Sequence, residues 1–218
     1  MNKTIKCILI DLDGTIINSG PDLIDSLNFV LENQNIKKID RRIIGSLVGG
    51  GAKVMIMRAY QHLKLKPPSN IDLLVEEFLD FYLKHCSNKS HLYLEVFDTL
   101  KKLKSKFKLA LCTNKKQFIT EKILKDFRIK EFFDYVLGSS PKTKLKPHTE
   151  MLEQCLNKCN VKAEHAVMIG DSNNDIIPAK HLCMKSIYVT YGYGKIEKSI
   201  KPDYAIDSFD EVLKVLKF

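Results

Sequence analysis

The run Lys6-Cys7-Ile8-Leu9-Ile10, followed at once by Asp11-Leu12-Asp13-Gly14-Thr15, decides the fold of this chain. A short apolar run that ends in polar residues predicts a buried strand. Side chains alternate along an extended segment, so Asp11 and Asp13 are expected on one face, and Gly14 lets the chain turn sharply away. Two carboxylates held this close repel each other unless a cation lies between them or they share a proton. The pair therefore indicates a divalent metal site or an acid/base pair, the alternative being a turn in which the aspartates bond nearby backbone amides.

The composition is that of a globular protein. The chain has 218 residues, of which 44% are hydrophobic and 28% are charged, which suits one large domain or a domain with a smaller insertion. No apolar run approaches the length that spans a bilayer, and the apolar stretch before Asp11 is too short for the core of a signal peptide. We therefore expect a cytoplasmic protein without a membrane partner.

The formal net charge is +9, a surplus that can indicate nucleic-acid binding. The lysines are dispersed, however, as in Lys101-Lys102 with Lys104, Lys106 and Lys108, and they are not interleaved with aromatic residues. Most of them are expected to lie on solvated helix faces. The surplus should attract small anions such as phosphate esters, and nucleic acid is not predicted as a partner.

Residues from about 18 to 90 are predicted to be almost entirely helical, with no good strand. A helix start with proline in its first turn lies at Ser19-Gly20-Pro21-Asp22. A second helical stretch runs from about Arg41 to Leu65 and is broken by Gly49-Gly50-Gly51, and a third follows Pro67-Pro68-Ser69. We interpret the whole segment as an inserted helical cap.

Strands and helices alternate through the rest of the chain. Alternation of this kind predicts a parallel sheet with helices on both faces and right-handed crossovers. The predicted fold class is therefore α/β, a Rossmann-like parallel sheet core flanked by helices, with an inserted all-helical cap domain. The predicted domains are an α/β core of residues 1–17 and 91–218 and a helical cap of residues 18–90. The predicted strands after the first are Lys108–Cys112, Tyr135–Leu137, Ala166–Ile169, Ser186–Val189 and Tyr204–Ile206.

Polar clusters follow the predicted strands, and in open parallel sheets ligands bind beyond the carboxyl ends of the strands. The second strand ends in Thr113-Asn114-Lys115, and the strand at Ala166–Ile169 ends in Gly170-Asp171-Ser172-Asn173-Asn174-Asp175. Lys144-Leu145-Lys146-Pro147 precedes a predicted helix. Each cluster alone also fits a plain turn or an acidic helix start.

These segments, in this order, resemble the four motifs of the haloacid dehalogenase superfamily. The motifs are Asp11-x-Asp13-Gly14-Thr15, Thr113-Asn114, Lys146-Pro147 and Gly170-Asp171-Ser172-x-x-Asp175, and the similarity spans almost the whole chain. The all-helical segment after the first motif is similar to the helical cap of that superfamily. The resemblance implies phosphoryl-transfer chemistry with a Mg²⁺ cofactor.

The resemblance implies a catalytic role for four of the matched residues. Asp11 would attack phosphorus and form an aspartyl-phosphate, and Asp13 would protonate the leaving alkoxide and then activate water. Thr113 would offer its hydroxyl, and Asn114 its backbone N–H, to a phosphoryl oxygen. Lys146 would neutralise charge on the transferring group and on the attacking carboxylate.

The same resemblance implies the ligands of the magnesium ion. Mg²⁺ is a hard ion that prefers a few carboxylates together with water and substrate phosphate. Asp171 would hold it, with help from Asp175 and Asp11. The backbone carbonyl of Asp13 is implied as a further ligand.

Other residues indicate which members of the superfamily the chain resembles. Asp13 argues against a dehalogenase, because in that class the ester forms on carbon and no phosphate ester supplies a leaving alkoxide that needs an acid at this position. Thr113-Asn114-Lys115, Val48-Gly49-Gly50-Gly51 and Val189-Thr190-Tyr191-Gly192-Tyr193-Gly194 resemble phosphoglycolate phosphatases. The stretch Gly49-Gly50-Gly51 would contact the organic part of the substrate when the cap closes, or it is only a flexible break between two helices. The residues expected to bind substrate or phosphate are Gly14, Thr15, Asn114, Gly50 and Gly51.

We therefore predict a Mg²⁺-dependent phosphatase for a small phosphorylated metabolite such as 2-phosphoglycolate, acting as a monomer or homodimer. A sugar phosphomutase or a pyrophosphatase on the same scaffold is the alternative. A third interpretation, suggested by the positive charge, is a non-enzymatic protein that binds phosphate or nucleic acid, and the intact motifs disfavour it.

Overall fold

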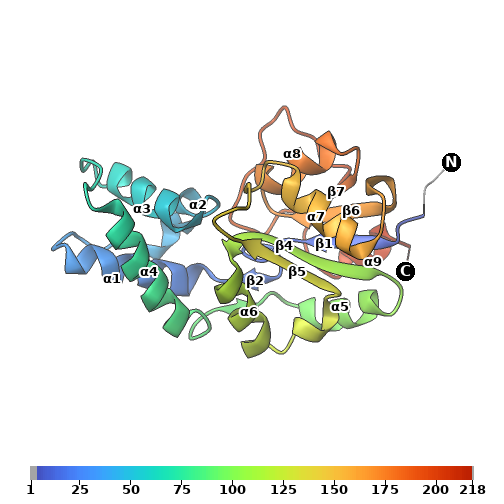
Figure 1. The fold of residues 1–218 in the computed structure, drawn as a ribbon, viewed down its shortest axis with the longest axis horizontal. Coiled ribbons are helices and arrows are strands. Elements are labelled where there is room, and N and C mark those ends of the chain that lie inside the picture. The colour runs from blue at the N-terminus through green and yellow to red at the C-terminus, as the bar shows by residue number, and fades with distance from the viewer. Residues whose placement is uncertain (1–3, 218) are drawn as a thin grey trace.

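A six-stranded parallel sheet forms the centre of the structure, which confirms the predicted α/β fold. The computed structural model describes residues 4–217. The strand order is β5-β4-β1-β6-β7-β8, and every neighbouring pair is parallel. Figure 1 shows helices on both sides of this sheet and a separate group of helices at one end of the molecule. The strands are β1 (Cys7–Ile10), β4 (Lys108–Lys116), β5 (Tyr135–Ser139), β6 (Ala166–Gly170), β7 (Lys185–Val189) and β8 (Tyr204–Ile206).

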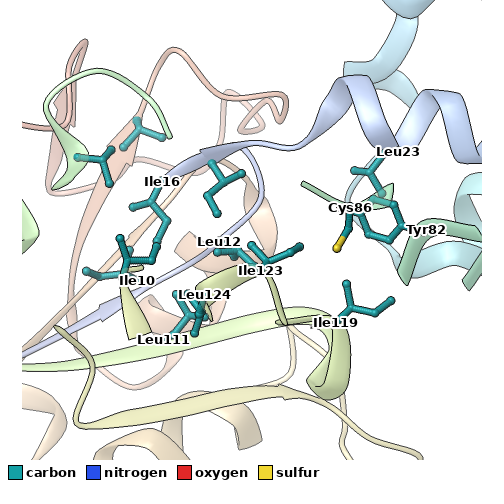
Figure 2. Close-up of a cluster of buried hydrophobic side chains, with 14 of the residues drawn as sticks. Ile10, Leu12, Ile16, Leu23, Tyr82, Cys86, Leu111, Ile119, Ile123 and Leu124 are labelled. Carbon is teal, nitrogen blue, oxygen red and sulfur yellow. The ribbon is translucent and has the colours of Figure 1, made fainter. Parts of the chain in front are cut away.

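Alternation of side chains along β1 divides the core into two layers. Ile8 and Ile10 belong to a large hydrophobic cluster, and Cys7 and Leu9 belong to a smaller one on the other face. All four side chains are fully buried. Figure 2 shows the large cluster between the sheet, α6 and the start of the cap. The large cluster includes residues of α5 (Val96–Lys104), α6 (Gln117–Asp126) and α9 (Glu211–Val215), and the small one includes residues of α7 (Glu150–Cys159) and α8 (Asn173–His181).

The segment predicted to be helical folds into four helices that pack on one another. The helix α1 (Gly20–Asn33) packs on α4 (Ile71–His85), α4 packs on α3 (Gly51–His62), and α3 packs on α2 (Ile44–Leu47). The glycine stretch interrupts this region as predicted, because a loop separates α2 from α3. None of the helices described over residues 4–217 has the length and hydrophobicity needed to cross a membrane. The division into domains at residues 18 and 90 stays a prediction.

The segment that enters the cap pairs with the segment that leaves it, a feature that the sequence did not predict. The strand β2 (Ile17–Asn18) runs antiparallel to β3 (His91–Leu92), with Ile17 opposite Leu92 and Asn18 opposite His91. Strands of two residues are too short to show alternation of apolar and polar side chains, so no periodic signal marks them. The pairing keeps the two ends of the cap about 5 Å apart, the spacing of neighbouring strands.

A buried carboxylate fastens the same junction. Asp22, in the first turn of α1, is only 2% exposed. It accepts hydrogen bonds from the backbone N–H of Lys89 at 3.0 Å, and from the backbone N–H and the hydroxyl of Ser90 at 2.8 and 2.7 Å. Hydrogen bonds to an ionised acceptor are about twice as strong as neutral ones. Asp22 therefore joins the start of the cap to the segment by which the chain returns to the sheet.

We expect Asp22→Asn to lower the free energy of unfolding by about 2–4 kcal/mol, because the amide NH₂ would face backbone donors and leave at least one of them unpaired. Urea denaturation measures the loss. Asp25→Asn is the matched control, since Asp25 lies on the next turn of α1 and forms ion pairs with Arg41 and Lys89 near the surface. Its loss should be about 1 kcal/mol or less. Equal losses in the two variants would contradict the role given to Asp22.

Candidate active site

The carboxyl ends of three neighbouring strands meet at one edge of the sheet. The strand β1 lies between β4 and β6, so the residues that follow these strands converge. Asp11 follows β1 and Asp171 follows β6. The ladder between β4 and β5 is irregular between Cys112 and Lys116. That irregularity frees the segment with Thr113 and Asn114, predicted as phosphate-binding residues, from regular pairing.

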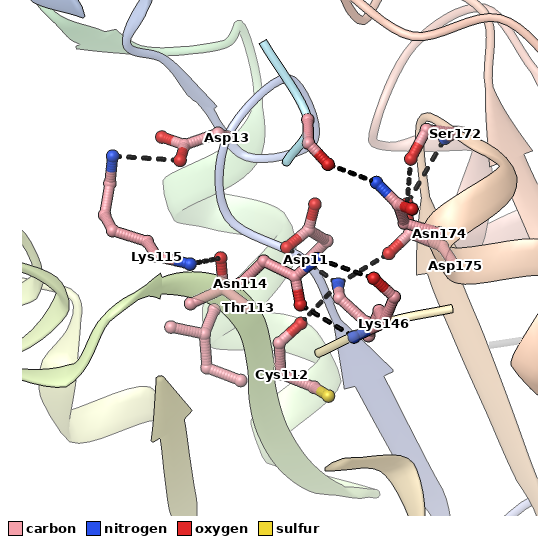
Figure 3. A network of polar contacts seen from close by, with 12 residues as sticks. Asp11, Asp13, Cys112, Thr113, Asn114, Lys115, Lys146, Ser172, Asn174 and Asp175 are labelled. Atoms are coloured by element: carbon pink, nitrogen blue, oxygen red, sulfur yellow. Dashed lines mark hydrogen bonds and ion pairs between the residues drawn. The ribbon is translucent and has the colours of Figure 1, made fainter. Parts of the chain in front are cut away.

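Lys146 links the acidic segments and is almost completely buried, at 3% exposure. Its Nζ lies 2.6 Å from Asp175 Oδ1, 3.0 Å from Asp11 Oδ1 and 2.7 Å from the carbonyl oxygen of Cys112 (Figure 3). Burial alone lowers the pKa of Lys146, but the charges of Asp11 and Asp175 outweigh it and raise that pKa well above its ordinary range. The ammonium is therefore charged, and it sits between two carboxylates.

Asn114 holds the backbone of Lys146 in place. Asn114 Nδ2 donates to the carbonyl oxygen of Lys146 at 2.9 Å, and the backbone N–H of Lys146 donates to Asn114 Oδ1, also at 2.9 Å. This reciprocal pair fixes the loop that carries the lysine against the end of β4. Thr113 is buried beside it, and its hydroxyl oxygen accepts from the backbone N–H of Lys115 at 3.3 Å.

Backbone encloses the carboxylate of Asp171, which is 5% exposed. Its Oδ2 accepts from the backbone N–H groups of Tyr193 and Gly194, at 2.8 and 2.9 Å. Gly14 has φ +77°, and a Cβ at this position would lie 2.2 Å from Asp171 Oδ2. Only glycine permits this approach, so Gly14 positions Asp171 as well as turning the chain.

Asp175 holds the turn that begins with Asp171. It is fully buried, and its Oδ2 accepts from the backbone N–H of Ser172 at 3.2 Å and from the Ser172 hydroxyl at 3.0 Å. Its other oxygen accepts from Lys146. The pair of Ser172 and Asp175 forms a capping box at the start of α8. Both oxygens of Asp175 therefore already have protein partners.

Three carboxylates gather around one point. Oxygens of Asp11, Asp171 and Asp175 all lie within 4.8 Å of one another. Burial raises the pKa of Asp11 to about 6, although Lys146 opposes the shift, and burial together with Asp175 and Asp11 raises the pKa of Asp171 to about 7. Carboxylates that resist ionisation in this way are stabilised by a bound cation. The donor set consists of oxygens and suits a hard divalent ion.

Asp13 lies outside this acidic group and has its own partners. Ser19 Oγ donates to Asp13 Oδ1 at 2.5 Å, and Lys115 Nζ lies 2.9 Å from Asp13 Oδ2. Lys115 also donates to the hydroxyl of Tyr82, on cap helix α4, at 2.8 Å. The sequence did not predict Ser19 and Lys115 as partners of Asp13. The only available signal was that Lys115 directly follows Asn114.

A cavity of about 750 Å³ lies between the acidic residues and the cap. Gly50 and Gly51, predicted as substrate contacts, line it. Gly14 and Thr15, predicted as phosphate-binding residues, are not among the residues that line it. Thr15 is fully buried, and its carbonyl oxygen accepts from the hydroxyl of Tyr191 at 2.8 Å. The core residues that line the cavity include Asp11, Asp13, Thr113, Asn114, Lys146 and Asp171.

Two residues for which the sequence predicted no individual role, Asn174 and Tyr193, connect the core to the cap. Asn174 Nδ2 donates to the carbonyl oxygen of Gly49 at 2.6 Å (Figure 3). The hydroxyl of Tyr193 donates to Asn18 Oδ1 at 2.5 Å and accepts from the backbone N–H of Gly20 at 2.6 Å. The glycine loop of the cap, residues 48–50 between α2 and α3, therefore contacts the start of α8, which follows Asp171.

The chain is similar in sequence and in fold to known hydrolases. The family model described as haloacid dehalogenase-like hydrolase matches residues 8–189. The chain is 36% identical to a phosphoglycolate phosphatase of Colwellia psychrerythraea, over 97% of each chain, and 34% identical to one of Haemophilus influenzae, over 99% of this chain and 100% of the other. The crystal structure of a predicted phosphoglycolate phosphatase from Haemophilus somnus superposes with a TM-score of 0.90 at 30% identity, over 97% of each chain.

The raised pKa values predict how the stability of the metal-free protein depends on pH. The folded state binds protons to Asp11 and Asp171 more tightly than the unfolded state, whose carboxyls ionise near pH 4. The stability linked to these groups is therefore complete below about pH 4 and is lost as the pH rises to about 7. Asp171→Asn should lose less stability across this window, as measured by thermal unfolding in chelator. Equal pH slopes for the two proteins would contradict the raised pKa of Asp171.

Proposed function

The chain belongs to the haloacid dehalogenase-like hydrolases, and we propose that it is a Mg²⁺-dependent phosphatase that hydrolyses a small phosphorylated metabolite such as 2-phosphoglycolate. The observation that carries the proposal is the buried ammonium of Lys146 beside Asp11, with Asp171 and Asp175 next to them. A carboxylate held against a fixed cation and open to a cavity is suited to attack a phosphate ester. The relatives named phosphoglycolate phosphatase support the substrate.

Asp11 is the proposed nucleophile. Its carboxylate would form a bond to phosphorus while the bond from phosphorus to the ester oxygen breaks, which splits hydrolysis into two easier steps. Lys146 keeps this carboxylate oriented and offsets negative charge on the transferring group. Thr113 and the backbone N–H of Asn114 would bind phosphoryl oxygens.

Asp13 is the proposed acid and base. Ser19 and Lys115 fix its carboxylate at the cavity in one orientation, which proton transfer requires. It would give a proton to the leaving alkoxide and then take one from the water that hydrolyses the aspartyl-phosphate. Restoring Asp11 and releasing inorganic phosphate completes the reaction.

Asp11 and Asp171 are the proposed metal ligands, together with the backbone carbonyl of Asp13. The two oxygens of Asp175 already accept hydrogen bonds, so Asp175 supports the ion by its charge and by holding the turn. A bound Mg²⁺ supplies electrostatic stabilisation of the phosphoryl oxygens. The proposed catalytic domain comprises residues 1–17 and 91–218, and residues 18–90 form the proposed cap, which excludes water when substrate is bound.

We expect Asp11→Asn and Asp13→Asn to lower phosphatase turnover by about 10³-fold or more, because each removes a group that acts directly on the reacting atoms. Phosphate release from 2-phosphoglycolate measures turnover, and thermal unfolding checks that both variants fold. Asp134→Asn is the control, since Asp134 pairs with Lys104 at the start of β5, away from the cavity. Normal turnover by either site variant would refute the role given to that residue.

Removal of divalent cations should abolish phosphate release, and Mg²⁺ should restore it. A panel of 2-phosphoglycolate, sugar phosphates and pyrophosphate identifies the preferred substrate. Full activity in the presence of chelator would disprove the metal site. Isomerisation of a sugar phosphate without phosphate release would instead favour a mutase, and failure to release phosphate from any ester would overturn the proposed function.

A further inference from the structure

The cavity contains more positive charge than the proposed phosphate chemistry uses. Its cationic lining residues are Lys53, Arg58, Lys115, Lys116, Lys146 and Lys195. Lys146 pairs with Asp11 and Asp175, Lys115 pairs with Asp13, and Lys53 pairs with Asp72. Within residues 4–217, no acidic side chain forms an ion pair with Arg58, Lys116 or Lys195. Of these three, only Arg58 belongs to the cap.

Arg58 is anchored through one of its nitrogens. It lies on α3, and its Nη1 donates to the carbonyl oxygen of Val48 at 2.8 Å and to that of Leu47 at 3.3 Å. Both acceptors are neutral, so the guanidinium keeps its full charge. In the described part of the chain no protein acceptor binds Nε or Nη2. These two nitrogens form the planar edge that binds carboxylates through two parallel hydrogen bonds.

The loop that anchors Arg58 is itself tied to the core. The carbonyl oxygen of Gly49 accepts from Asn174, and that of the preceding residue, Val48, accepts from Arg58. One short loop therefore connects Arg58 to the turn that follows Asp171. A ligand in the cavity thus has the acidic residues and Lys146 on its core side and Arg58 on its cap side.

We propose that Arg58 is a specificity-determining residue that binds the second anionic group of the substrate, the carboxylate of an ester such as 2-phosphoglycolate. The inference rests on the proposed phosphatase function and assigns a residue of the cap to substrate recognition at the same site. The phosphate of such a molecule binds at the core while its carboxylate binds the fork of Arg58. The substrate then bridges core and cap, so its second charge stabilises the closed state in which the chemistry occurs.

Two esters of similar size test the proposal. They are 2-phosphoglycolate and 2-hydroxyethyl phosphate, which carries a neutral hydroxyl in place of the carboxylate and is called the neutral ester below. In the full chain with Mg²⁺, Arg58→Gln should lower kcat/KM for 2-phosphoglycolate by about 10- to 100-fold, mainly through KM, and change that for the neutral ester by less than about 2-fold. Arg58→Lys keeps the charge but not the fork and should recover part of the loss. Lys53→Gln is the matched control, because Lys53 lies on the same helix and the same cavity and its charge is balanced by Asp72.

Several outcomes would overturn the proposal. Equal losses for both esters in Arg58→Gln would mean that Arg58 only braces the loop, and no loss would mean that it binds no substrate group. A selective loss in Lys116→Gln without one in Arg58→Gln would move the carboxylate site to the core. Equal use of both esters by the unaltered protein would also refute it.

A binding measurement separates this inference from the proposed function. Calorimetry compares 2-phosphoglycolate with the neutral ester in Asp11→Asn and in Asp11→Asn/Arg58→Gln, so no turnover is needed. Tighter binding of the carboxylate ester that disappears in the second protein supports the role of Arg58 even if no ester is hydrolysed. No preference in Asp11→Asn would overturn the role of Arg58 even if phosphatase activity is found.

Discussion

Carboxylates from two neighbouring strand ends converge in a largely buried cluster, and the ammonium of Lys146 lies between Asp11 and Asp175. Buried charges are tolerated only when they are paired and hydrogen-bonded, and loss of one partner leaves the others uncompensated. The sheet brings the acids together, but the cation arrives from a loop outside it. That loop is held by the side chain of Asn114. The geometry of the whole site thus depends on one lysine and on the residue that positions it.

The core and the cap contribute different groups to the site. Groups proposed to act on phosphorus follow the strands of the core, where rigid backbone fixes their positions. The cap contributes the far wall of the cavity, including the glycine loop and Arg58. Polar contacts between the parts include the bond from Asn174 to Gly49 and the contact of Lys115 with Tyr82. The acids therefore belong to the core, and the surface that faces the rest of the substrate belongs to the cap.

Much of this architecture could be predicted from the sequence, and the exceptions share a physical cause. Long alternation of strands and helices predicted the sheet, and strand ends rich in polar residues predicted that Asp11, Thr113 and Asp171 would lie near one another. Contacts that depend on how loops meet in space had no periodic signal. The pairing of β2 with β3 and the bond of Asn174 to Gly49 are of this kind. That Gly14 binds phosphate stays a prediction, and the sequence did not predict that its lack of a side chain makes room for Asp171.

The junction of β2 and β3 has a consequence for how such molecules diversify. The inserted unit is connected to the sheet by two adjacent chain segments, β2 and β3, which lie about 5 Å apart. Hydrogen bonds from the segment near β3 to Asp22 hold them together. An insert whose ends meet at that separation would leave the strand order unchanged, with Asp11 and Asp171 still following β1 and β6. Selection can then change the inserted unit while the catalytic residues of the core stay the same, so that the same reaction can be carried out on different substrates.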